Sequence, residues 1–300
     1  MISPITTHQM QPLNPILTAH LFPKVDGLLL DVLRSLSPDD WEKQTVSAKW
    51  KVKDVAAHLL DTALRGLSIA RDGYAPSAPN IDSPAALAAH IDRLNAEGVS
   101  FYRRLSPAVL ISLMEVACKQ LAHYHATRDP YAQAPFGVSW AGEEKSANWF
   151  DTAREYTERW HHQQQIRLAV NPPKTAHPGI MTPELYGPVL DCFMRALPFA
   201  YRNVSASPGT TIRIAVSGDC GGNWILSREE RSWVLTEDAP VQPAGGKTAR
   251  PAAETIIPEE IAWRIFTKGI SRDSALSQVQ ITGDSALALP VLSMVSIVSA

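Results

Sequence analysis

The sequence places a carboxylate and an imidazole four residues apart, at Glu158 and His162. If this segment is helical, the two side chains share one face, with about 5–6 Å between their Cβ atoms. A carboxylate and an imidazole held in this way can bind one divalent metal ion, each at about 2.0–2.2 Å. The same spacing is also common in surface ion pairs on helices, so the pair alone leaves both interpretations open.

A third candidate ligand, His58, lies much earlier in the chain, next to the apolar residues Val55 and Leu59. Inward polar side chains from facing helices form metal sites in helical bundles. Three protein ligands with one open position are typical of a catalytic zinc site. We therefore predict that His58, Glu158 and His162 bind one divalent metal ion, with a hydrogen-bonded core histidine as the alternative for His58.

The other histidines offer further alternatives. His161 follows Glu158 by three residues and competes with His162 for the same role. A di-metal centre would need a second helix with an E-x-x-H pair, and the sequence contains none. His123 and His125 fall on opposite faces of a helix, so at most one can point inward, toward the site or a substrate.

The elements that would position these residues follow from the hydrophobic pattern. Apolar residues recur at helical spacing, and Ser83-Pro84 and Ser106-Pro107 are typical helix starts. The predicted helices cover residues 14–36, 52–71, 83–105, 106–127 and 146–169, with a loop beginning at Trp41. Long helices with short connections indicate an up-and-down bundle, which we place over residues 1–172.

The pattern changes after a proline-rich segment, Pro172 to Pro183, which we interpret as a linker. Beyond it we predict helices over 183–200, 258–270 and 285–300, strands over 210–218, 222–229, 231–238 and 277–284, and a polar loop over 238–255. The first three strands follow one another closely and should pair antiparallel. The sequence therefore predicts a small α+β domain over residues 180–300.

Composition excludes several classes of function. The 300 residues carry 28 Lys and Arg against 30 Asp and Glu, a net charge of −2, which argues against nucleic-acid binding. Three cysteines indicate a reducing compartment rather than a disulfide framework. The N-terminus lacks the pattern of a signal peptide, and the late apolar stretch 285–300 is too short to span a bilayer. We expect a cytoplasmic monomer or homodimer without a membrane partner.

Two segments carry a family resemblance. SAKWKVKDVAAHLLD (Ser47 to Asp61) and AREYTERWHHQQQIR (Ala153 to Arg167) resemble the metal-binding helices of the mycothiol-dependent maleylpyruvate isomerase family. That family is part of a superfamily of DinB-like metal-binding four-helix bundles. The resemblance covers about residues 10–170 and extends more loosely, through GGNWILSRE, AWRIFTKG and VQITGDSALALPVLSMV, to the family's small sterol-carrier-like α+β domain.

The resemblance implies a Zn²⁺ ion held by His58, Glu158 and His162, and a low-molecular-weight thiol (mycothiol, bacillithiol or glutathione) as cosubstrate. The implied reaction is cis–trans isomerisation, by thiolate addition and elimination, of a small-molecule electrophile such as maleylpyruvate. Cationic side chains would face a dicarboxylate substrate, and by residue type the candidates are Arg65, Arg154 and Arg264. The alternatives are a thiol S-transferase of the same superfamily and a non-catalytic module that binds a metal or a ligand.

The cysteines bear on the source of the thiol. Cys118 falls on the fourth predicted helix, and Cys192 and Cys220 follow the linker, so none is beside the predicted ligands in sequence. Folding could still bring Cys118 near. We therefore expect an added thiol, rather than a cysteine of the chain, to supply the thiolate.

Overall fold

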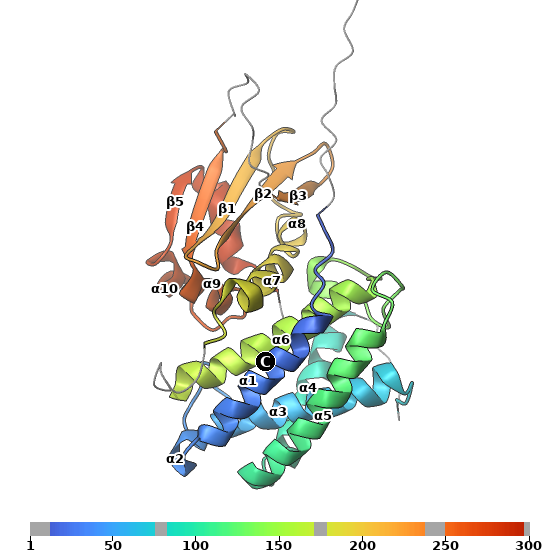
Figure 1. The fold of residues 1–300 in the computed structure, drawn as a ribbon. Helices are drawn as coiled ribbons and strands as arrows, with labels where there is room; N and C mark the ends of the chain where they lie inside the picture. Colours follow the sequence, from blue (N-terminus) through green and yellow to red (C-terminus); the bar gives the residue numbers. More distant parts are fainter. Residues whose placement is uncertain (1–12, 76–82, 171–178, 238–249, 297–300) are drawn as a thin grey trace, which may run out of the picture.

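The computed structural model describes residues 13–75, 83–170, 179–237 and 250–296. Long helices form the N-terminal part, and a sheet with shorter helices forms the C-terminal part (Figure 1). The helices of the first part are α1 (Phe22–Ser35), α2 (Pro38–Trp41), α3 (Val52–Gly66), α4 (Pro84–Tyr102), α5 (Pro107–Thr127) and α6 (Asn148–Val170). Short 3-10 turns at Ala19–Leu21 and Ser139–Ala141 and a π-helical turn at Leu67–Arg71 complete it.

Local sequence explains where these helices begin. Ser83 and Ser106 accept hydrogen bonds from the backbone of the first turns of α4 and α5, and a proline follows each serine, as predicted. The first helix begins at Phe22 rather than at residue 14, because Pro23 is suited to a helix start and not to its middle. Trp41 ends the one-turn helix α2, which Ser37 caps, instead of beginning a loop.

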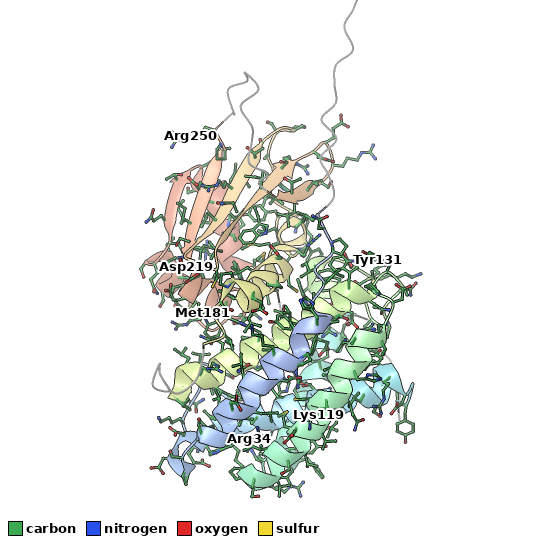
Figure 2. All side chains as sticks on the ribbon, viewed as in Figure 1. Arg34, Lys119, Tyr131, Met181, Asp219 and Arg250 are labelled. Atoms are coloured by element: carbon green, nitrogen blue, oxygen red, sulfur yellow. The ribbon has the colours of Figure 1, made fainter. Side chains whose placement is uncertain are left out.

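The helices pack as a bundle around a continuous apolar core. Helix α3 is central, in contact with α4, α5 and α6, while α1 packs against α5 and α6. Charged side chains such as Arg34 and Lys119 project from the outer surface (Figure 2). Both bind Glu115, at 2.8 and 3.0 Å, and exposed pairs of this kind contribute little to stability.

The second part is an α+β unit, as predicted. Its elements are α7 (Pro183–Met194), α8 (Leu197–Ala200), β1 (Thr211–Ser217), β2 (Gly222–Arg228), β3 (Trp233–Glu237), β4 (Ala253–Pro258), α9 (Glu259–Phe266), α10 (Arg272–Leu276), β5 (Gln280–Gly283), α11 (Ser285–Ala288) and a 3-10 turn at Leu289–Ser293. Most of the predicted linker, and so the domain boundary, lies at 171–178, outside the described residues.

The sheet has the order β3-β2-β1-β4-β5, with β1 and β4 parallel and the other pairs antiparallel. Alternate residues of β1, including Ile212 and Ile214, are buried. Thr255 and Ile257 continue this pattern in β4. One face of the sheet is therefore packed against helices, and α7 and α9 lie between it and the bundle (Figure 1).

Two C-terminal predictions were wrong. The predicted loop over 238–255 ends in strand β4, which begins at Ala253; its alternating burial extends over only six residues, too few to stand out in the sequence. The predicted final helix over 285–300 is a short helix followed by a 3-10 turn, because Pro290 cannot continue the helical hydrogen bonding.

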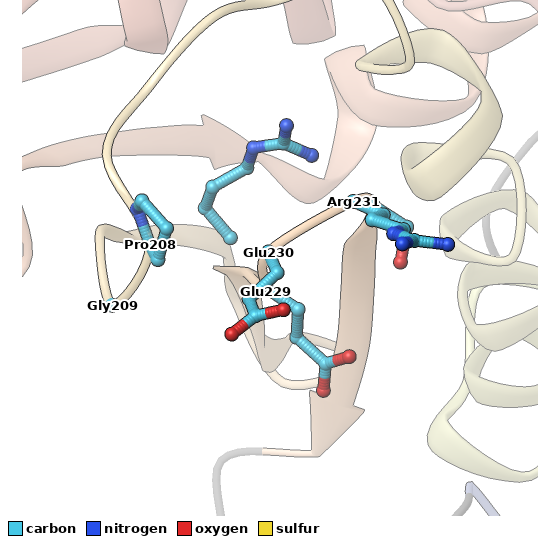
Figure 3. Close-up of a pocket in the computed structure, with 7 residues that line it drawn as sticks. Pro208, Gly209, Glu229, Glu230 and Arg231 are labelled. Carbon is cyan, nitrogen blue, oxygen red and sulfur yellow. The ribbon is translucent and has the colours of Figure 1, made fainter.

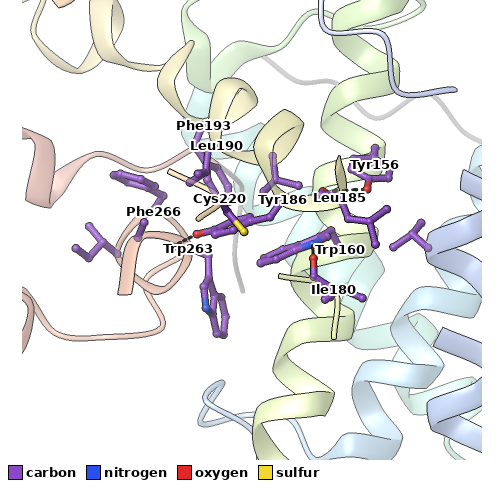
Figure 4. Packing of buried hydrophobic residues seen from close by; sticks show 14 of the residues in the cluster. Tyr156, Trp160, Ile180, Leu185, Tyr186, Leu190, Phe193, Cys220, Trp263 and Phe266 are labelled. Carbon is purple, nitrogen blue, oxygen red and sulfur yellow. Dashed lines mark hydrogen bonds between the residues drawn. The ribbon is translucent and has the colours of Figure 1, made fainter. Parts of the chain in front are cut away.

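Aromatic residues join the two parts (Figure 4). Trp160 of α6 stacks on Tyr186 of α7, with ring centroids 4.4 Å apart and an interplanar angle of 4°. The Trp160 indole donates to the Ile180 carbonyl at 2.9 Å, and Tyr156 donates to the Leu185 carbonyl at 3.0 Å. Helix α6 is therefore shared by the bundle and by the interface. None of the helices within the described ranges combines the length and apolar content needed to cross a membrane.

Candidate metal centre

One stripe of helix α6 carries the polar residues of the candidate site. Glu158, His161, His162 and Gln165 have the spacing i, i+3, i+4 and i+7, so their side chains share one face of the helix. The two imidazoles and Gln165 are buried, and Glu158 is partly exposed. The predicted helical pairing of Glu158 and His162 is confirmed, because His162 Nε2 lies 3.5 Å from Glu158 Oε2.

The loop before α3 brings an aromatic ring to the same place. The Trp50 carbonyl accepts hydrogen bonds from the Thr45 backbone and hydroxyl, at 3.2 and 2.7 Å. Lys51 N then donates to Asp54 Oδ2 at 3.1 Å and caps α3. The Trp50 ring lies 4.6 Å from that of His58 and 6.0 Å from that of His162, measured between centroids.

Helices α3 and α6 place the predicted ligands next to one another. The His58 and His162 rings meet edge to face, with centroids 4.6 Å apart. Nδ1 of His58 is buried and has no hydrogen-bond partner among the described residues. Burial, followed by the neighbouring His162, Arg65 and His161, lowers the pKa of His58 well below its usual range, which keeps the imidazole neutral and able to bind a cation.

The most compact group of ligand atoms among the described residues differs from the prediction in one member. It consists of Glu158, His161 and His162, whose ligand atoms lie within 4.8 Å of one another. His161 therefore takes the place in this group that the sequence prediction gave to His58, whose ring packs against His162 from the facing helix. Burial lowers the pKa of His161 well below its usual range as well.

The distance between Glu158 and His162 is informative. At 3.5 Å, the contact is long for a hydrogen bond from imidazole to carboxylate. Two ligands of one tetrahedral ion, each about 2.0–2.2 Å from it, lie roughly 3.3–3.6 Å apart. The spacing of these two atoms therefore fits a shared divalent cation.

Gln165 connects the two adjacent histidines. His162 Nδ1 lies 2.9 Å from Gln165 Oε1, and Gln165 Nε2 lies 3.1 Å from His161 Nε2. The side chain is buried, so these are its contacts inside the bundle rather than at the surface. The sequence prediction gave Gln165 no role, although its spacing from Glu158 is a signal that could have identified it.

The α+β part contributes an aromatic side chain, Trp263, beside His161. Trp263 of α9 lies with its ring centroid 5.9 Å from that of His161 and 6.4 Å from that of Trp160. Figure 4 shows Trp263 near Trp160 and Tyr186 at the interface. Tyr186 holds α9 in place, because its hydroxyl donates to the Glu259 carbonyl at 2.9 Å and accepts from Trp263 N at 3.1 Å.

The other predicted candidates lie elsewhere or have partners. His125 points inward and His123 is exposed, as expected for positions on opposite faces. His125 stacks on Phe22 and bonds Thr152 at 3.2 Å, apart from the compact ligand group. Cys118 is buried and accepts from Arg159 Nη2 at 2.8 Å.

The three candidate arginines differ in their hydrogen-bond and salt-bridge partners. Arg65 binds Asp61 and Asn95, each at 2.7 Å. Arg154 binds Asp151 and Glu155, each at 2.8 Å. Arg264, which follows Trp263 in α9, has a buried Nε without a hydrogen-bond partner in the described part of the chain.

A separate hollow lies at the turn between β2 and β3 (Figure 3), with a volume of about 510 Å³. Its lining residues are Pro208, Gly209, Arg228, Glu229, Glu230, Arg231 and Ser232. It contains neither a histidine nor a cysteine, and it is at the opposite end of β2 from α9. The chemistry proposed for the histidines therefore does not involve this hollow.

Comparison with known proteins agrees with this architecture. Residues 23–167 match the family model described as the mycothiol maleylpyruvate isomerase N-terminal domain, which confirms the resemblance for the helical part. No curated protein matches the chain.

Two solved structures are similar in fold over most of the chain. One is the mycothiol-dependent maleylpyruvate isomerase, and the other is a histidine-to-alanine mutant of that enzyme. Their identities to this chain are 12% and 11%, each with a TM-score of 0.50 and coverage of 88% of this chain and 91% of the other. The similarity therefore extends beyond the helical part into the α+β part.

Proposed function

We propose that the chain belongs to the family of the mycothiol maleylpyruvate isomerase N-terminal domain, whose model matches residues 23–167. From this premise we propose that the protein binds one divalent metal ion, most favourably Zn²⁺, through His58, Glu158 and His162, and that it catalyses a thiol-dependent cis–trans isomerisation. The single observation that supports the metal best is the 3.5 Å spacing between His162 Nε2 and Glu158 Oε2. The neutral, buried His58 against the His162 ring is the third ligand of the proposal. The match to the family model supports the reaction class.

A bound divalent cation would lower the pKa of a coordinating thiol, so that a thiolate is available at neutral pH. Addition of that thiolate to a conjugated double bond leaves a single bond between the two carbons. Rotation about the single bond and loss of the thiolate then give the trans isomer and return the thiol unchanged. The chain itself must orient the ligands, shield the site and bind the substrate's anionic groups.

Residues around the site suit these tasks. Trp50 lies beside His58 and His162, and Trp263 lies beside His161, so the imidazoles have aromatic neighbours that limit hydration. Of the three predicted arginines, Arg264 is the one proposed for a substrate carboxylate, because its buried Nε has no hydrogen-bond partner among the described residues. Arg65 and Arg154 already bind carboxylates of the chain.

An external thiol is preferred to a cysteine of the chain. Cys118 lies in the bundle, and burial raises its pKa to about 11, so it is a neutral thiol at pH 7. Burial raises the pKa of Cys192 to about 12. Neither would supply a thiolate at neutral pH. We therefore propose mycothiol, with bacillithiol and glutathione as the other thiols to be tested.

The test combines metal analysis with an assay. The purified chain should contain close to one equivalent of metal, and His58→Ala or His162→Ala should reduce this content well below stoichiometric, because two ligands retain an ion poorly. His123→Ala, which removes an exposed imidazole, is the control and should keep its metal. Full metal content in His58→Ala together with loss of metal in His161→Ala would replace His58 by His161 as the third ligand.

Activity is tested separately with maleylpyruvate and each of the three thiols. Turnover should require both the metal and a thiol, and a chelator should abolish it. Turnover of aryl halides instead of maleylpyruvate would favour an S-transferase. Hydrolysis that is independent of thiol but sensitive to a chelator would contradict the proposed reaction.

A further inference from the structure

The side-chain amide of Gln165 is hydrogen bonded to two imidazoles at once. Its oxygen lies 2.9 Å from His162 Nδ1, and its nitrogen lies 3.1 Å from His161 Nε2. All three side chains are at least nine-tenths buried. An amide is suited to this place because it offers an acceptor and a donor in one group.

The orientation of this amide sets where each imidazole carries its proton. Gln165 Oε1 is an acceptor only, so His162 must donate from Nδ1 and keep the lone pair on Nε2, the atom that faces Glu158. With the amide in this orientation, Gln165 Nε2 is the donor, so His161 accepts at Nε2 and carries its proton on Nδ1, a buried atom with no hydrogen-bond partner among the described residues. The opposite orientation of the amide would put the His162 proton on Nε2, between the imidazole and Glu158.

We propose that Gln165 is a positioning residue that selects His162, and not His161, as the metal ligand. The inference rests on the proposed metal site and deepens it. His161 belongs to the compact group by distance, yet its Nε2 lone pair is occupied by the amide and its Nδ1 carries a proton. Residues that orient a ligating histidine from behind typically contribute 10–100-fold to metal affinity.

Helix α6 supplies a matched control. Gln164 is the same residue type one position away and is only partly buried, so substitutions there test the helix without touching the amide contacts. Gln165→Leu removes the donor and the acceptor. Gln165→Glu keeps the acceptor for His162 Nδ1 but, as a carboxylate, cannot donate to His161.

Two measurements decide the proposal. The first is the tautomer of each imidazole, from long-range ¹H–¹⁵N NMR of the metal-free chain at about pH 8, where neutral imidazoles dominate. The wild-type chain should show the proton on Nδ1 of both His161 and His162. Gln165→Glu should keep this state at His162 and move the His161 proton to Nε2, and Gln164→Glu should change neither.

The second measurement is zinc affinity, by competition with a chromophoric chelator, together with the visible spectrum of the Co²⁺-loaded chain. Gln165→Leu should bind Zn²⁺ about 10–100-fold more weakly, Gln165→Glu within about threefold of wild type, and Gln164→Leu as wild type. A wild-type proton on His162 Nε2, or unchanged zinc affinity in a folded Gln165→Leu, would overturn the inference. If Gln165→Leu fails to fold, the wild-type and Gln165→Glu tautomers decide it. Absence of metal binding by the wild-type chain would instead contradict the proposed function. The tautomers are measured without metal, so they test the role of Gln165 separately from metal binding.

Discussion

The two halves of the molecule differ in what they bury. Among the described residues, every buried Asp, Arg and His lies in the helical part, from Asp26 to Arg167. In the described α+β part the buried polar side chains are the hydroxyls of Thr255, Thr267 and Ser296, each donating to a backbone carbonyl.

We infer from this difference that the helical part carries the functional groups and that the α+β part supports them. Buried ionisable groups cost free energy unless they are paired, and they gather where a protein binds or reacts. In the helical part such groups form salt bridges: Arg159 binds Asp26 at 2.6 Å, and Arg128 binds Asp151 at 2.9 Å. Among its described residues, the α+β part has no Asp, Arg or His that is buried as a whole residue, and its Trp263 lies beside His161.

The largest effect on stability is expected at the buried ion pair of the bundle. Arg159→Met should lower the free energy of unfolding by about 3–5 kcal/mol, because Asp26 would remain buried without its partner. Urea unfolding followed by circular dichroism measures this loss. The double variant Asp26→Leu, Arg159→Met should recover most of it, and a double variant as unstable as the single one would contradict the explanation.

An intermediate effect is expected at His125 as the pH falls. Burial lowers the pKa of His125 to about 4, while the unfolded chain binds the proton near 6.5. The free energy of unfolding should therefore decrease between pH 6.5 and 4, by up to about 3 kcal/mol from this residue alone. His125→Gln should have a shallower dependence on pH than wild type in parallel denaturant titrations; identical slopes would show that His125 does not titrate in this way.

The smallest effect is expected in the α+β part. Thr267 donates to the Trp263 carbonyl at 2.8 Å, and that carbonyl also accepts the Thr267 backbone N–H. Thr267→Val should therefore cost less than about 1 kcal/mol, because the isosteric side chain leaves no buried carbonyl without a partner. Thermal unfolding is sufficient to measure it. A cost as large as that of Arg159→Met would remove the contrast between the two halves.

Much of the helical part could be predicted from sequence because its helices are long, and α1 and α3 are strongly amphipathic. Serine-proline starts located α4 and α5, and the spacing of Glu158 and His162 identified one face of α6. Strand β4 was missed because its pattern is short and neither of its pairing partners, β1 and β5, is adjacent to it in sequence.

The candidate site was predicted in part, for a similar reason. Local spacing on α6 is visible in the sequence, whereas the approach of His58, Trp50 and Trp263 depends on how three separate elements pack. Gln165 lies between these cases. Its spacing from Glu158 is local, but its bridge to two histidines depends on rotamers that a sequence does not specify.

The stacking of Trp160 on Tyr186 has a consequence for how the chain melts. Helix α6 carries the candidate ligands on one face and the Trp160 stack on another, and Tyr186 holds both Glu259 and Trp263 of the α+β part. Separation of the two parts would therefore expose one side of the helix that presents Glu158 and His162. Unfolding should then be cooperative across the whole chain, and a ligand bound only by the bundle would raise the melting temperature of both halves together.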